Sequence, residues 1–111
     1  MRLSQLGKSQ WQGYFDRFSR TLGPKRVEIE VTGLGLGHQV QAKWIPLMGV
    51  SYDPRNDVVA VVAEGVDHLI RKPAQIHLQH DAEWVHGIEV TDADGIRHTL
   101  TLKEPLILPP P

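Results

Sequence analysis

The amino-acid sequence predicts an α+β domain: an N-terminal amphipathic helix over about residues 9–22 packed on a curved antiparallel sheet, or partly open barrel, of about six or seven strands. Two observations predict this fold class. Apolar residues recur with a helical period only near the N-terminus, whereas alternating or continuous apolar runs between turn signals fill the rest. With 111 residues and 41% hydrophobic residues, the chain is expected to form a single domain, 1–111, ending in an extended proline tail, 109–111.

The helix is predicted by one stripe of large apolar side chains. Its members fall at i, i+3, i+4, i+7 and i+11: Trp11, Tyr14, Phe15, Phe18 and Leu22. This spacing covers an arc of about 100°, the width of a core-facing stripe. We expect Ser9 to cap the helix, with Gln12 reaching back to it, and Gly23 and Pro24 to end it.

The segment after the helix is interpreted as three short strands. Residues 27–31 and 40–44 alternate apolar and polar side chains, and a shorter strand over 47–52 follows Pro46. The Gly-x-Gly-x-Gly run at 33–37 is expected to be a flexible hairpin turn. A dinucleotide-binding fingerprint has a different glycine spacing and lies in a βαβ unit, which is missing here.

The stretch over residues 52–70 is expected to form the centre of the core. The Asp-Pro-x-Asn-Asp cluster at 53–57 predicts a chain reversal, because proline presets φ and Asx side chains bond their own backbone. The run 58–63 lacks polar alternation, which is typical of a strand buried on both faces. After Glu64-Gly65, residues 66–71 are interpreted as an irregular or helical turn closed by Pro73.

The last third is interpreted as a further set of strands. Residues 75–79 give a short strand, and 80–83 resemble a loop. Strands over 85–91 and 96–103 flank an Asp94-Gly95 pair, a strong hairpin signal because both residues accept positive φ. Residues 105–108 are a candidate for a short edge pairing.

Composition and charge limit the possible classes of function. The absence of cysteine excludes disulfides, thiolate metal sites and cysteine nucleophiles. No apolar run reaches the length of a signal peptide or a membrane helix, so we expect a cytoplasmic protein with no membrane partner. A net charge of −1 argues against a nucleic-acid partner.

The charges are unevenly divided between the two halves of the chain. Residues 1–56 hold eight basic and four acidic side chains, and residues 57–111 hold four and nine. This asymmetry favours halves that face each other within the domain or across a dimer. A basic N-terminal surface for an anionic partner is the alternative.

No catalytic residue is predicted, because neither a nucleophile–base pair nor a pair of carboxylates is placed together by sequence logic. The weak ligand-binding candidates are the polar or aromatic residues that could line a hollow in a curved sheet: Tyr52, Asp67, His68 and Trp84. His77 and His80 are a weak alternative for a metal site. A strand would place them on opposite faces, so we expect neither a metal nor another cofactor.

Three motifs span the chain: W-x-x-Y-F near its start, Y-D-P-x-x-D-V at its centre and E-G-x-D-H-L-I directly after. They are formed by Trp11, Tyr14, Phe15; Tyr52, Asp53, Pro54, Asp57, Val58; and Glu64, Gly65, Asp67, His68, Leu69, Ile70. With these motifs the chain resembles a bacterial family of short proteins of unknown function over nearly its full length. The resemblance implies a compact bacterial cytosolic domain and brings no catalytic residue with it.

The absence of an assembled reactive group favours a small non-enzymatic cytosolic interaction or accessory protein. Its partner would be a second copy, as a homodimer joined through a strand edge or through complementary charged surfaces, or another protein. The alternative is a small-molecule binder or enzyme that uses a pocket on the curved sheet.

Overall fold

A computed structural model describes residues 1–108 and shows that the α+β prediction is wrong. Strands make up 67% of the structure and helical segments only 12%. Within residues 1–108, one open sheet of eight antiparallel strands replaces the predicted six or seven, and the single α-helix is short. The predicted proline tail, 109–111, lies outside the described residues.

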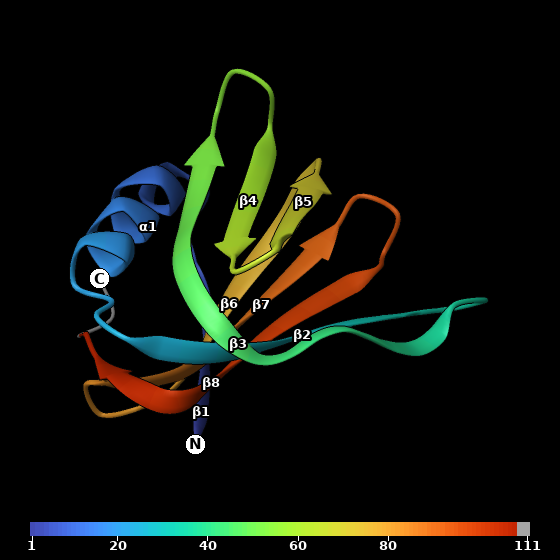
Figure 1. The fold of residues 1–111 in the computed structure, drawn as a ribbon. Helices are drawn as coiled ribbons and strands as arrows, with labels where there is room; N and C mark the ends of the chain where they lie inside the picture. The colour runs from blue at the N-terminus through green and yellow to red at the C-terminus, as the bar shows by residue number, and fades with distance from the viewer. Residues whose placement is uncertain (109–111) are drawn as a thin grey trace.

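The sheet is formed by strands that are not in sequence order. The elements are β1 (Arg2–Leu6), the 3-10 turn η1 (Lys8–Gln10), α1 (Trp11–Arg20), β2 (Lys25–Gly33), β3 (Gly37–Asp53), β4 (Val58–Ala63), β5 (Val66–Arg71), β6 (Pro73–Asp81), β7 (Trp84–Asp92) and β8 (Arg97–Ile107). The strand order is β1-β6-β7-β8-β2-β3-β4-β5, and every neighbouring pair is antiparallel. β1 and β5 are therefore the two edges (Figure 1).

The long strand β3 merges the two strands predicted over 40–44 and 47–52, and it bends. Trp44 has a φ of 55°, which is unusual for a non-glycine residue. The register of β3 shifts against β2 on both sides of Ile29, and against β4 between Leu47 and Gly49. Such bulges bend a strand and increase its twist. Figure 1 shows β3 curving from the β2 hairpin to the β4 hairpin, and β5 thereby reaches β7.

The buried apolar residues form one cluster that draws on α1 and on every strand. All five residues of the helical stripe are buried, and α1 packs against β3. The ring of Trp11 meets Tyr52 edge-on, with 5.1 Å between centroids, and its Nε1–H donates to the carbonyl of Leu6 at 3.1 Å. The predicted cap at Ser9 is wrong, because the 3-10 turn precedes the helix and Gln10 Oε1 instead accepts from the N–H of Gly7.

Two predictions about the strands are also wrong, and one strand was not predicted. The run Val58–Ala63 is next to the sheet edge rather than central, and Val62 is 38% exposed. The segment predicted as an irregular turn is the edge strand β5. β1 was not predicted, because a five-residue segment with a single buried side chain, Leu6, shows no apolar alternation. β1 forms by pairing with β6.

One side chain fastens the helix to the bent strand. Ser19 Oγ donates to the carbonyl of Val50 at 2.7 Å and accepts from the N–H of the same residue at 2.9 Å. Gly49 lies beside this contact, where a Cβ would be in ordinary van der Waals contact with Ser19 Oγ, at 3.5 Å. The hydroxyl thus satisfies both backbone groups of Val50 where β3 passes under α1.

Replacing Ser19 with alanine is expected to lower the free energy of unfolding by about 1–3 kcal/mol, because it leaves two backbone groups without partners. Urea denaturation followed by circular dichroism measures this loss. Ser9→Ala is the matched control, since Ser9 is exposed and no cap depends on it. Equal stability of the two variants would contradict the role given to Ser19.

Candidate functional site

β5 forms the candidate site, because it exposes unpaired backbone along one side. A two-residue turn joins β4 to β5, and Gly65 supplies its positive φ of 76°. The pair that flanks such a turn is hydrogen-bonded, and bonded pairs alternate along the ladder. Val66, His68 and Ile70 therefore bond to β4. The residues that alternate with these are Asp67, Leu69 and Arg71. Their N–H and C=O groups point away from the sheet, and we call these three residues the β5 edge.

The side chains of the β5 edge also face solvent. Leu69 is 49% exposed, an unusual position for a large aliphatic residue on an edge strand. Exposed Val62 and Met48 lie on the neighbouring strands β4 and β3. Within residues 1–108, the side chains of Asp67 and Arg71 have no ion-pair or hydrogen-bond partner. The β5 edge thus combines free backbone groups, one apolar side chain and two unpaired charges of opposite sign.

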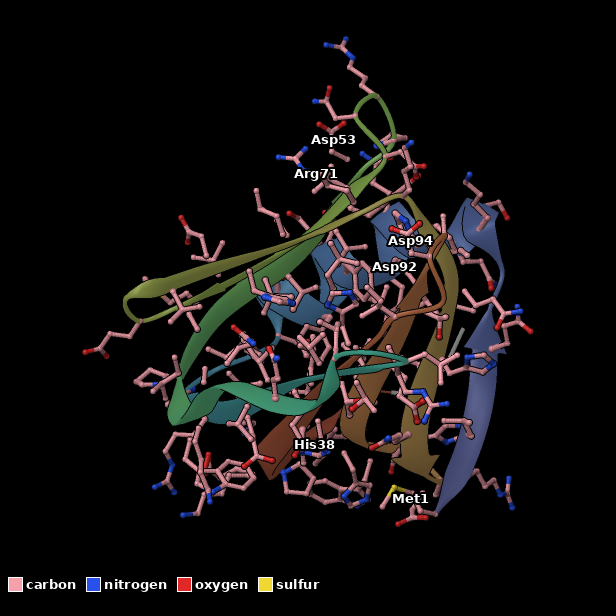
Figure 2. All side chains as sticks on the ribbon, turned by 90° about the vertical axis from the view of Figure 1, so that its right-hand side faces the viewer. Met1, His38, Asp53, Arg71, Asp92 and Asp94 are labelled. Atoms are coloured by element: carbon pink, nitrogen blue, oxygen red, sulfur yellow. The ribbon has the colours of Figure 1, made fainter. Side chains whose placement is uncertain are left out.

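The opposite face of β5 carries a partly buried chain of polar side chains. His68 Nε2 lies 2.9 Å from His98 Nδ1, and His98 Nε2 lies 3.0 Å from Asp92 Oδ2. The other carboxylate oxygen of Asp92 accepts from the N–H groups of Asp94 and Ile96, at 2.9 and 3.0 Å. His98 is only 7% exposed. Figure 2 shows Asp92 and Asp94 together on the β7–β8 turn.

The direction of each hydrogen bond follows from the carboxylate. An ionised Asp92 only accepts, so His98 Nε2 must carry the proton and donate it. The neutral His98 then accepts at Nδ1, and His68 Nε2–H is the donor. Burial and the nearby His98 lower the pKa of His68. Burial by itself would raise the pKa of Asp92, but the hydrogen bonds from His98, Ile96 and Asp94 outweigh it and lower that pKa.

The hydrogen-bonded row of His68, His98 and Asp92 connects the edge strand to the other half of the sheet. β5 ends the sheet order, whereas Asp92 belongs to β7 and His98 lies on β8, the third and fourth strands counted from the opposite edge. The backbone supports the same connection, since Lys72 donates to the carbonyl of Asp57 and accepts from the N–H of Ala93, both at 2.9 Å. The His68–His98–Asp92 chain therefore holds β5 over the β7–β8 hairpin.

The structure does not bring together the four predicted ligand-binding residues. Tyr52 is buried, and its hydroxyl donates to Asp57 Oδ1 at 2.8 Å. Burial, with this carboxylate, raises the pKa of Tyr52 to about 12. Asp67 and His68 point to opposite faces of β5, and Trp84 lies at the start of β7 beside Asp81 and Ile107.

The sequence interpretation missed four residues of this candidate site: Leu69 and Arg71 of the β5 edge, and Asp92 and His98. A signal for His98 exists in the alternation. His98 precedes Leu100 and Leu102 on the inward face of β8, so it stands where an apolar residue is expected. His68 holds the same kind of position between Val66 and Ile70. Polar residues at inward positions indicate that their partners are other buried polar groups.

The alternative metal pair is also separated. His77 and His80 both lie on β6, three residues apart, and so face opposite sides of it. In residues 1–108, no group of three or more potential metal-ligating side chains is found.

His80 contacts a serine, an arrangement that resembles a nucleophile and its base. Its Nε2 lies 2.6 Å from Ser4 Oγ, whereas its Nδ1 is buried with no partner. A buried N–H without an acceptor is costly, so the ring proton belongs on Nε2, which donates to Ser4. A nitrogen that already carries its proton does not accept the serine proton, and Ser4 is therefore not activated.

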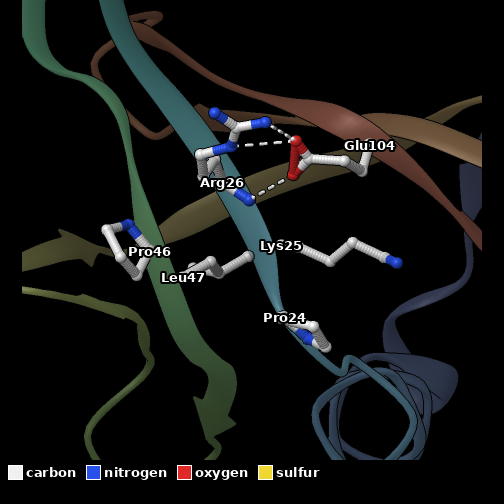
Figure 3. Close-up of a pocket in the computed structure, with 6 residues that line it drawn as sticks. All are labelled: Pro24, Lys25, Arg26, Pro46, Leu47 and Glu104. Carbon is white, nitrogen blue, oxygen red and sulfur yellow. Dashed lines mark hydrogen bonds and ion pairs between the residues drawn. The ribbon is translucent and has the colours of Figure 1, made fainter.

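A hollow of about 330 Å³ lies elsewhere, between the start of β2 and the middle of β3 (Figure 3). Two of its three charged lining residues are bonded to each other, because Arg26 Nε lies 2.9 Å from Glu104 Oε2 and the backbone N–H of Arg26 donates to Oε1 at 3.0 Å. Lys25 is the third, and Pro24, Pro46 and Leu47 complete the lining. The hollow therefore offers a ligand mainly apolar surface and the ammonium group of Lys25.

None of the helices in the described part of the chain has the length and apolar character needed to cross a membrane.

The comparisons with known proteins agree over almost the entire chain. A family model described as "Family of unknown function (DUF5335)" matches residues 2–111. A protein of Aquifex aeolicus (strain VF5) called "Uncharacterized protein" is 37% identical over 110 residues, which cover 98% of this chain and 99% of that protein. No solved structure matches the chain.

The lowered pKa of His68 predicts a pH dependence of stability. Its neutral form is favoured in the folded protein, so the unfolded chain takes up a proton first as the pH falls through about 6.5. We expect His68 to lower the free energy of unfolding below that pH, with a slope of at most about 1.4 kcal/mol per pH unit.

Urea denaturation between pH 7.5 and 5.5 measures this slope, and His68→Gln isolates it, because glutamine keeps an N–H donor for His98 but does not titrate. The variant should lose stability less steeply with acid than the wild type. Parallel curves for the two proteins would show that His68 does not contribute.

Proposed function

We propose that this protein is a non-enzymatic interaction protein. Because the chain belongs to the family of unknown function DUF5335, its function has to be inferred from its own residues. It forms a homodimer in which β5 pairs antiparallel with β5 of a second copy. The observation that carries this proposal is the self-complementary β5 edge: free backbone, an exposed Leu69, and Asp67 and Arg71 spaced equally on either side of it.

The two-fold symmetry of a homodimer fixes the register of this pairing. A two-fold axis at Leu69 places the leucine opposite the partner's Leu69, because the same surface must meet itself. Asp67 then lies opposite the partner's Arg71, and Arg71 opposite the partner's Asp67. Opposite charges in directly facing positions stabilise a strand pair, and like charges destabilise it. The apolar pair at the centre is thus flanked by an ion pair on each side.

The backbone supports the same register. Asp67, Leu69 and Arg71 are the residues whose N–H and C=O point outward, so all three facing pairs would be hydrogen-bonded pairs. Each such pair exchanges two bonds, which gives about six backbone hydrogen bonds across the axis. Strand addition of this kind supplies affinity through the main chain and specificity through alternate side chains.

The other free edge fits a second copy less well. In β1, a two-fold axis at Ser4 would place Leu3 opposite Gln5 and Arg2 opposite Leu6. Neither pair combines opposite charges. Pairing of β1 with β5 would join two different surfaces, which produces an open filament unless the rotation closes it. The β5–β5 arrangement closes at two chains.

Substitutions on the β5 edge test the dimer in sedimentation velocity experiments, which should give twice the 12.5 kDa mass of one chain for the wild type. Leu69→Asp is expected to make the protein monomeric, because it places two carboxylates together at the axis. Leu34→Asp is the matched control: Leu34 is fully exposed on the β2–β3 turn, far from β5 in sequence.

Charge reversal tests the register itself. Asp67→Arg should weaken the dimer roughly tenfold or more, since two ion pairs become two repulsive contacts. The double variant Asp67→Arg/Arg71→Asp should restore it, because each charge again faces its opposite. A wild-type protein that stays at 12.5 kDa at high concentration would refute the homodimer, and failure of the double variant to recover would refute the register.

A further inference from the structure

The same strand carries the proposed dimer edge on one side and a titratable group on the other. His68 lies between Asp67 and Leu69, and its side chain points inward while theirs point outward. Any change that displaces His68 therefore displaces the backbone groups that pair across the two-fold axis. β5 is only six residues long, so no neighbouring segment of the strand absorbs such a displacement.

We propose that the His68–His98–Asp92 chain is a proton switch for this edge: it holds β5 ready to pair near neutral pH and releases the dimer in mild acid. This inference rests on the homodimer proposed above and names its regulation. Holding a strand in its paired conformation favours association, because less conformational freedom is lost on binding.

The groups that face His68 determine the direction of the switch. In residues 1–108, the titratable groups in contact with its ring are His98 of β8 and, through His98, Asp92 of β7. Asp67 and Arg71 lie on the other face of the strand. A proton added to His68 creates an imidazolium that is partly buried beside His98, a position that disfavours its charge. Moving β5 away from the β7–β8 hairpin returns this charge to water, so acid favours the released strand.

Pairing adds a second reason for release in acid. In the register centred on Leu69, the inward face of the new strand pair places His68 opposite the partner's Ile70. This contact removes water from an imidazole that is already partly buried, and burial disfavours its charged form. The dimer therefore binds fewer protons than two monomers do, so its affinity falls as the pH decreases.

The dissociation constant of the dimer, measured by sedimentation between pH 7.5 and 5.5, tests the switch. We expect it to rise at least about tenfold for the wild type, because two copies of His68 are linked to one association step. His68→Gln should be far less sensitive to pH over this range. His38→Gln is the control, since His38 is exposed on β3 and pairs with Glu30; it should keep the wild-type dependence. A wild-type dissociation constant that does not change with pH would overturn the proposal.

Amide hydrogen exchange distinguishes this failure from failure of the dimer. If the wild type is monomeric even at pH 7.5, the homodimer is refuted and the switch is tested in the monomer alone. After correction for intrinsic rates, the amides of His68 and Ile70 should lose protection relative to those of β7 between pH 7.5 and 5.5, and not in His68→Gln. Unchanged protection of β5, or equal loss in both proteins, would refute the switch.

Discussion

The bend of β3 is the constraint on which the rest of this structure depends. Seventeen residues form one strand, and a straight strand of that length would carry β4 and β5 away from β7 and β8. The positive φ of Trp44 and the register shifts around it turn the strand back over the sheet. The bend is supported on its outer side, where Lys103 Nζ lies 5.6 Å from the centre of the Trp44 ring. Both the single core and the contact between β5 and the β7–β8 hairpin follow from it.

The bent sheet encloses polar groups as well as apolar ones. A buried imidazole is costly unless its nitrogens find partners, and His98 finds one on each side. Asp92 has two roles, because one oxygen closes the β7–β8 turn through two backbone N–H groups while the other orients His98. A turn residue thereby controls the tautomer of a core histidine, and that histidine in turn controls which nitrogen of His68 is protonated.

β5 has one feature that most proteins avoid at a sheet edge, an exposed large aliphatic side chain, Leu69. Natural edges are commonly protected by charges, proline or bulges, since free strand edges tend to associate. Here the charges are of opposite sign and symmetric about an exposed leucine. In the proposed dimer, this order of charges matches its own copy and faces like charges in a strand with a different order, which would make the edge specific instead of prone to aggregation.

The local features could be predicted from the sequence alone. The stripe of α1, the reversal at 53–57 and the Asp94-Gly95 turn all depend on residues near one another in the chain, so spacing and turn chemistry were enough to predict them. It did not reveal β1, β5 or the mostly β fold class. Val66–Arg71 places histidine inside and leucine outside, the reverse of the pattern that identifies a strand. The contact between His68 and His98, thirty positions apart, could be known only from the folded chain, because strand pairing and the bend of β3 are long-range interactions that no local sequence pattern records.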